Sequence, residues 1–218
     1  MFNRESREEY IRQQQIYVTT SVVIFSIVQG TLCVILLQRG YEPYEWLWML
    51  PSGYVFNDAS AQDTLREKIF HKIWLKNIPL QEVWSFSDPS RDSRRRVICL
   101  AYMSVGQFHD IKQWTKYGSV SYHALKELPV LAFDHAQIIK RAYAILREQL
   151  ATTSIAQHFL PKTFTLASLK TVYDIILWTH SDLSNFRKWV TSRHLAIPTN
   201  KKEKNVAHRP AMLWKFVG

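Results

Sequence analysis

The sequence predicts an α+β protein in which a mixed domain of strands and helices, residues 1–150, precedes a smaller domain, residues 151–218. A chain of 218 residues with 47% hydrophobic content can form one large domain or two small ones with packed cores. Strand-like and helix-like patterns alternate through the first two thirds. The last third is strongly basic and contains two helical patterns followed by two strand-like segments, which favours a second domain.

An uncharged run from Tyr17 to Gln38 opens the first domain. Its length also suits a transmembrane helix, which is the alternative interpretation. The run is rich in β-branched residues and contains Ser, Thr and Gln side chains, so we expect two buried strands joined at residues 29–31. We expect no signal peptide, because the polar stretch 4–15 mixes acidic and basic residues.

The two cysteines, Cys33 and Cys99, each lie among aliphatic residues. We expect them to be reduced, buried side chains rather than a disulfide or metal ligands. This indicates a reducing compartment and, with the strand interpretation above, a cytoplasmic protein without membrane attachment.

The next segments alternate between strand and helix. Residues 41–51 are interpreted as a loop that enters a short strand, and the chain turns at 52–53. Ser60 and Asp63 form a capping-box-like start to a helix that ends before Pro79. Its inward residues are spaced four apart: Leu65, Ile69 and Ile73.

A strand at 83–86 and a buried strand at 97–103 flank a polar turn. Asp134 is the predicted N-cap of a long helix. One face of this helix is expected to contain Ile138, Ala142, Ile145 and Gln149. The pattern breaks at 151–154, where we place the domain boundary.

Two short helices in tandem are predicted after the boundary. Thr165 is the N-cap of the first, whose inward residues are Leu166, Leu169, Val172, Tyr173 and Ile176. Asp182 begins the second, whose inward stripe is Leu183, Phe186 and Val190. The opposite face of the second helix then presents the polar residues Ser184, Asn185, Arg187, Lys188 and Thr191.

Two strand-like segments, 195–197 and 211–216, surround a basic tip that includes residues 200–205 and 208–209. A helix pair followed by such a hairpin is typical of a winged helix-turn-helix domain, with the hairpin as its wing. Trp189 and Trp214 are expected in the core of this small domain. A solvated charged loop is the alternative for the tip.

The formal charge of +10 and the isoelectric point near 9.6 favour a polyanionic partner. With a winged helix, that partner is double-stranded DNA. Arg187 has the reach and donors to pair with guanine, and Asn185 with adenine. The side chains suited to phosphates are Lys188 and Arg193, together with Lys201, Lys202, Lys204 and Arg209 of the wing.

Four groups of residues carry a family resemblance: 48–53, 86–92 with Arg96, 131–135, and 164–166 with 185–187. On these, the N-terminal domain resembles Nudix hydrolases, and the whole chain is similar to the NrtR group of Nudix-related transcriptional regulators. The resemblance implies a Nudix-type α/β/α sandwich followed by a winged helix. It also implies binding to operator DNA and a response to ADP-ribose, a related NAD metabolite or a sugar metabolite. Because winged-helix regulators commonly read two half-sites, a homodimer is expected.

The Nudix box, however, departs from the catalytic pattern. A working box is a helix whose glutamates hold magnesium ions. We counted the positions of the box from Gly53. Ala59 then stands where the first Glu is expected, and Glu67 and Lys68 stand where an Arg-Glu pair is expected. His71 and Lys72 replace the Glu-Glu pair, and Trp74 replaces the Gly of the box. If the count is shifted by one residue, Asp58 matches the first acidic position and residues 66–67 match the Arg-Glu pair. Phe70 and His71 then occupy the positions of the Glu-Glu pair. We therefore expect no enzyme activity, no bound metal and no cofactor, with Lys68 and Lys72 where cations would lie.

The remaining pocket is expected to bind the effector. Guanidinium groups match phosphate oxygens, and the candidate ligand-binding residues are Arg39, Arg91, Arg94 and Arg96. The alternative is that residues 94–96 form a solvated turn, or dimer contacts with Asp88 and Asp92.

Three other functions remain in competition with a ligand-responsive DNA-binding regulator. One is a Nudix-type ADP-ribose pyrophosphatase with a substituted metal site, which would need carboxylates that the helix does not offer. Another is an adaptor whose basic tail binds RNA or protein, and the last is a membrane-attached protein.

Overall fold

The uncharged run folds as the predicted hairpin in this computed structural model, which describes residues 15–76, 78–108, 111, 114–115, 118–204 and 210–217. β1 (Tyr17–Val28) and β2 (Thr31–Gln38) pair antiparallel. Gln29 and Gly30 join them with φ angles of 48° and 76°, and two successive positive φ angles suit a tight hairpin turn. Among the described residues, no helix has the length and apolar character needed to cross a membrane.

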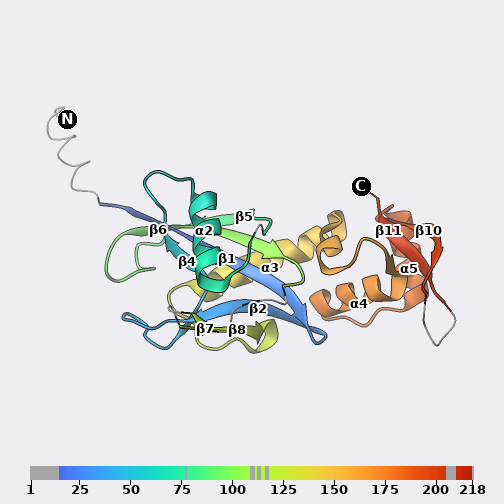
Figure 1. The fold of residues 1–218 in the computed structure, drawn as a ribbon, viewed down its shortest axis with the longest axis horizontal. Coiled ribbons are helices and arrows are strands. Elements are labelled where there is room, and N and C mark those ends of the chain that lie inside the picture. Colours follow the sequence, from blue (N-terminus) through green and yellow to red (C-terminus); the bar gives the residue numbers. More distant parts are fainter. Residues whose placement is uncertain are drawn as a thin grey trace.

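A mixed sheet forms the centre of the N-terminal domain, with strand order β5-β6-β1-β2-β8-β7 (Figure 1). β1 and β6 run parallel, whereas the other neighbours pair antiparallel. Two short strands extend the sheet: β3 pairs with β2, and β4 with β1. The remaining bounds are β3 (Trp48–Met49), β4 (Ser52–Tyr54), β5 (Gln81–Phe86), β6 (Val97–Val105), β7 (Trp114–Thr115) and β8 (Gly118–Ala124).

Two helices cover opposite faces of this sheet, which gives the predicted Nudix-type α/β/α sandwich. Successive residues of a strand point to opposite faces, so Val22 and Ile24 of β1 pack toward α2 (Ala61–Ile73), whereas Val23 and Phe25 pack toward α3 (His135–Thr152). The predicted inward residues of α2 are fully buried: Leu65, Ile69 and Ile73. Cys33 and Cys99 are free and buried, as expected.

The two predicted N-caps of this domain have different outcomes. Ser60 and Asp63 cap α2, because the Asp63 backbone N–H donates to Ser60 Oγ at 3.1 Å. Asp134 occupies the N-cap position of α3, as predicted, but its side chain accepts no capping hydrogen bond. Its carboxylate is instead engaged by Arg91 from the turn after β5.

The C-terminal domain combines the predicted helix pair with a three-stranded sheet of order β10-β11-β9. Thr165 and Asp182 cap the two helices as predicted, each accepting from a backbone N–H three residues on. The bounds are β9 (Phe164–Thr165), α4 (Leu166–Leu177), α5 (Leu183–Ser192), β10 (Ala196–Lys202) and β11 (Met212–Phe216). Short 3₁₀ turns, η1 (Leu125–Glu127) and η2 (Ile155–Phe159), complete the described elements.

Two details of this domain differ from the sequence prediction. Leu183 is 43% exposed, so only Phe186 and Val190 of the expected stripe on α5 are buried. Lys201 and Lys202 lie within β10 rather than at the tip of the hairpin. Trp214 is buried as predicted, and Trp189 packs against the same core.

Tyrosine hydroxyl groups tie α3 to α4, where the two domains meet. Tyr173 Oη donates to the carbonyl oxygen of Leu150 at 2.8 Å, and Tyr143 Oη donates to that of Ile176 at 2.7 Å. Burial raises the pKa of Tyr173 to about 12. The hydrophobic core also continues from α3 into α4 without interruption, so the two domains pack as one body.

We expect Tyr173→Phe to lower the free energy of unfolding by about 1 kcal/mol, because the buried Leu150 carbonyl loses its donor. For a chain of this size, the melting temperature should fall by about 2 to 4 °C. The exposed Tyr44 offers a control, since Tyr44→Phe should leave the melting temperature unchanged. Equal melting temperatures for wild type and Tyr173→Phe would contradict the assigned role.

Candidate functional site

A cavity of about 440 Å³ lies between α2, the segment after β2 and the turn after β5. Its described lining carries more positive than negative charge. The carboxylates are Glu67 and Asp92. The cationic residues that line it are Arg39, Lys68, Lys72, Arg91 and Arg94. The aromatic residues are Tyr41, Tyr54, Phe56 and Phe133.

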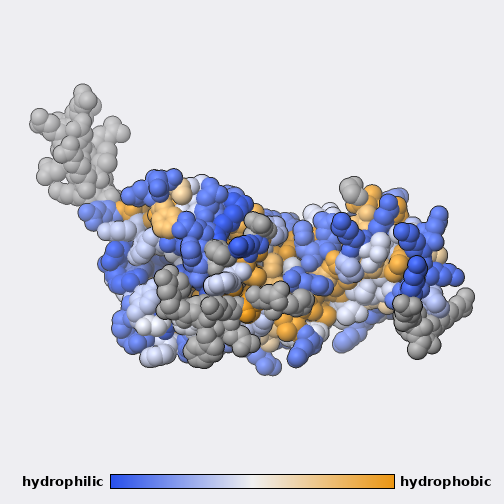
Figure 2. All heavy atoms as spheres, viewed as in Figure 1, coloured by the Kyte–Doolittle hydropathy of each residue, from blue (hydrophilic) through white to orange (hydrophobic). Residues whose placement is uncertain are grey.

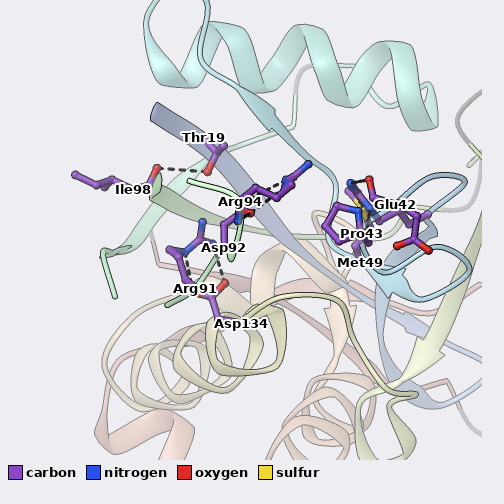
Figure 3. A network of polar contacts seen from close by, with 10 residues as sticks. Thr19, Glu42, Pro43, Met49, Arg91, Asp92, Arg94, Ile98 and Asp134 are labelled. Carbon is purple, nitrogen blue, oxygen red and sulfur yellow. Dashed lines mark hydrogen bonds and ion pairs between the residues drawn. The ribbon is translucent and has the colours of Figure 1, made fainter. Parts of the chain in front are cut away.

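Arg91 and Arg94 line the cavity, and each is paired with an aspartate (Figure 3). Arg91 holds Asp134 through two hydrogen bonds of 2.9 and 2.7 Å, and this pair is almost fully buried. Arg94 makes the same forked contact with Asp92, again at 2.9 and 2.7 Å, and these bonds keep the pKa of Asp92 below its usual range. The Arg94 side chain is 35% exposed, so it is the more accessible of the two arginines.

Arg39 is buried but its charge is not cancelled by a carboxylate among its described hydrogen-bond partners. Its guanidinium donates to the carbonyl oxygens of Glu42 and Pro43, and it stacks 3.8 Å from the centroid of the Tyr41 ring. Arg96, in contrast, donates to the Ser87 carbonyl oxygen and does not line the cavity. The structure therefore brings together three of the four predicted ligand-binding arginines.

Helix α2 contributes Lys68 and Lys72 to the cavity lining, at the positions where the sequence expected them. Lys72 Nζ donates to the Ser52 carbonyl oxygen at 2.6 Å. Burial, with the positive charges of Lys68 and Arg39, lowers the pKa of Lys72 to about 8. His71 also lines the cavity, with an exposed side chain whose Nε2 lies 3.8 Å from Glu67 Oε1.

This donor set does not fit the magnesium ions of a catalytic Nudix box. Magnesium takes oxygen ligands, mainly carboxylates, in octahedral geometry. Of the two cavity carboxylates, Asp92 is held by Arg94 and Glu67 faces His71. Within the described part of the chain, no group of three or more His, Cys, Asp or Glu side chains could hold a metal ion.

Phe133 and His135 are among the cavity residues that sequence reasoning did not assign to the site. The backbone N–H of Leu50 donates to His135 Nδ1 at 3.0 Å, which fixes the segment before β4 against α3. Burial, with the positive charges of Arg91, Arg39 and Lys72, lowers the pKa of His135 to about 3. Phe133 and His135 belong to residues 131–135, one of the groups that carry the family resemblance. Nothing in that sequence pattern indicates that the His135 imidazole accepts a backbone hydrogen bond.

A second candidate surface lies at the far end of the molecule, on α5 and the wing. Figure 2 shows hydrophilic residues at this end, interspersed with hydrophobic ones. All the predicted contact residues of α5 and its end are exposed: Ser184, Asn185, Arg187, Lys188, Thr191 and Arg193. Lys201, Lys202 and Lys204 are exposed on the wing, whereas Arg209 lies outside the described residues. The Arg187 guanidinium carbon is 5.8 Å from the centroid of the Trp214 ring.

The fold and these surfaces define a two-domain protein in which a Nudix-type domain with a cationic cavity precedes a winged helix. Residues 156–216 match the family described as the NrtR DNA-binding winged helix domain. The chain is 28% identical over 203 residues to the ADPR responsive transcriptional repressor NtrR of Acinetobacter baylyi, covering 91% of this chain and 81% of that protein.

Structural similarity extends over both domains. The structure of Shewanella oneidensis NrtR complexed with a 27mer DNA has a TM-score of 0.76 and 26% identity, covering 92% of this chain and 93% of that one. The N-terminal part alone is 25% identical over 134 residues to an ADP-ribose pyrophosphatase of Methanocaldococcus jannaschii, covering 60% of this chain and 77% of that enzyme. The resemblance to NrtR-type, Nudix-related regulators that the sequence predicts is confirmed.

We expect the stability of the protein to fall as the pH drops from about 6.5 towards 3. Below its usual pKa of about 6.5, His135 takes up a proton in the unfolded chain, but in the folded chain it stays neutral down to about pH 3. From this residue alone, the free energy of unfolding should fall by about 2 kcal/mol between pH 7 and pH 5.

Denaturant titrations at pH 7 and pH 5 test this expectation. His135→Asn keeps an acceptor near the Leu50 N–H and has no titrating group, so its pH dependence should be smaller by that amount. His158→Asn, on an exposed histidine, should keep the wild-type dependence. A wild-type dependence in His135→Asn would contradict the assignment.

Proposed function

We propose that this chain is a bacterial transcription regulator that binds operator DNA through its winged helix and responds to a small ligand bound in the Nudix-type cavity. The observation that carries this proposal is the exposed polar face of α5 beside a basic wing, in the region that matches the NrtR winged helix domain. The Acinetobacter relative is named as a repressor, which makes repression the expected mode.

In this proposal, α5 enters the major groove and the wing contacts the backbone. Arg187 and Asn185 read base edges. Phosphate contacts come from Lys188 and Arg193, with Lys201, Lys202 and Lys204 of the wing. Ser184, Thr191 and Arg209 complete the proposed contact set. A cytoplasmic homodimer that reads two half-sites and a domain boundary near residue 151 also belong to the proposal.

The proposed ligand is an anionic nucleotide or sugar metabolite such as ADP-ribose. The cavity supports this, since Arg39, Arg91 and Arg94 surround it together with aromatic side chains that can stack on a base. The Nudix domain of Shewanella oneidensis NrtR, 26% identical with a TM-score of 0.57 and covering 67% of this chain, was solved complexed with ADP ribose.

We expect Arg187→Ala to weaken operator binding by about 1 to 3 kcal/mol and to relax sequence preference, because it removes a bidentate base contact. Binding to the operator and to a scrambled duplex, with the operator located by footprinting, measures both effects. Arg147→Ala, on the exposed face of α3, is the matched control and should change neither. Equal loss on both duplexes would exclude Arg187 from base readout.

Lys204→Ala should weaken binding to both duplexes alike. A single neutralised phosphate contact contributes about 1 to the slope of log affinity against log salt, so that slope should decrease in magnitude by about 1. Titrations between low and moderate salt give the slope. If the slope and both affinities match those of the wild type, the wing lysine is a solvated charge rather than a DNA contact.

We propose that the Nudix-type domain does not hydrolyse its ligand. ADP-ribose should raise the melting temperature of the full chain by mass action, while magnesium or manganese should give no turnover. The alternative function is a pyrophosphatase with a substituted metal site, and the similarity to the Methanocaldococcus enzyme is what favours it. Turnover that disappears in Glu67→Gln would establish that alternative.

A further inference from the structure

Two lysines occupy the wall of the cavity where a catalytic Nudix helix carries glutamates. Lys68 and Lys72 are four residues apart on α2, so they lie on one face of the helix, and both line the cavity. Arg39 and Arg94 add positive charge from other elements. Positive charge therefore reaches the cavity from the helix itself, where a catalytic domain would need a metal ion to supply it.

The Lys68 side chain packs against the backbone of β4 at Gly53. A Cβ atom at Gly53 would lie 2.2 Å from Lys68 Cδ, a separation that real atoms do not reach. The absence of a side chain at Gly53 therefore lets the methylene groups of Lys68 cross β4. The Lys68 Nζ atom then lies 4.2 Å from the centroid of the Phe56 ring, at the cavity wall.

The Lys72 side chain is half-buried, and its positive charge is disfavoured by this burial and by nearby cations. Its bond to the Ser52 carbonyl oxygen fixes Nζ between α2 and β4. The pKa of Lys72 is lowered mainly by burial, and to a smaller extent by repulsion from the positive charges of Lys68 and Arg39. A bound anion would relieve that repulsion, because it brings negative charge among cations that face one another.

We propose that Lys68 and Lys72 take over the role of the divalent cation, binding the phosphoryl oxygens of a pyrophosphate-containing ligand directly, so that this chain binds such a ligand without magnesium. This inference rests on the proposed function and specifies the ligand class and the residues that select it. Two ammonium groups supply the charge of one divalent ion and match the two charges of a bridging pyrophosphate. They also leave no metal to activate water, which agrees with binding without turnover.

The test is calorimetric titration of the full chain with ADP-ribose, in EDTA and in magnesium. The wild-type affinity should be the same in both within about twofold. Lys68→Gln and Lys72→Gln should each weaken binding by about tenfold or more, because each removes a charge-assisted hydrogen bond. Lys140→Gln, on the exposed face of α3, should bind as the wild type does. Inorganic pyrophosphate should bind in EDTA and show the same dependence on Lys68.

Lys72→Gln also loses the bond to Ser52, so its melting curve is measured first, and Lys68→Gln decides the result if Lys72→Gln does not fold. A tenfold gain in wild-type affinity on adding magnesium would overturn the inference, as would wild-type affinity in Lys68→Gln. If ADP-ribose releases DNA equally from the wild type and from Lys68→Gln, the proposed lysine site is contradicted, whereas the proposed function as a ligand-responsive regulator is supported. If inorganic pyrophosphate binds with the expected dependence on Lys68 but ADP-ribose does not bind, ADP-ribose is not the effector, and the proposed lysine site is supported.

Discussion

The position of β1 inside the sheet is the constraint on which the rest of the structure depends. β1 pairs with β2, β4 and β6, and its side chains alternate between the two hydrophobic layers. The same alternation places Thr19 and Ser21 on the floor of the cavity. A register shift of one residue would exchange the two faces, so that Val22 and Ile24 would point toward α3 and Val23 and Phe25 toward α2.

Helix α3 lies between the cavity and the winged helix and contacts both. At its start, His135 lines the cavity, and the adjacent Asp134 is held by Arg91, which also lines it. Near its end, Leu150 accepts the hydrogen bond from Tyr173 of α4, the first helix of the winged helix. Packed contacts therefore run from the cavity to the helix pair through a single element of 18 residues.

Strong local patterns in the sequence were sufficient for much of this fold. The β-branched run of β1 and β2, the start of α2 at Ser60 and the caps at Thr165 and Asp182 were predicted because their signals lie within a few residues. β8 was not predicted, because its largely half-buried segment has no clear alternation of apolar residues and depends on pairing with β2.

Contacts between distant residues explain the remaining differences. Asp134 has the residue type of an N-cap, but Arg91, 43 positions earlier, takes its carboxylate. Arg96 belongs to the same arginine-rich turn as Arg94, yet the turn directs it to Ser87 and away from the cavity. The position of Lys68 and Lys72 at the cavity was implied by the resemblance to the Nudix box, and helical spacing adds that they share a face of α2.

The buried thiol of Cys99 has a practical consequence. Its Sγ donates to Ser21 Oγ at 3.3 Å, and burial raises its pKa, so the thiolate that reacts with alkylating reagents is scarce in the folded protein. Labelling at this position requires the pairing of β1 with β6 to open. The rate of alkylation at Cys99 thus reports on opening of the central sheet, and it does so in the natural sequence without an introduced probe.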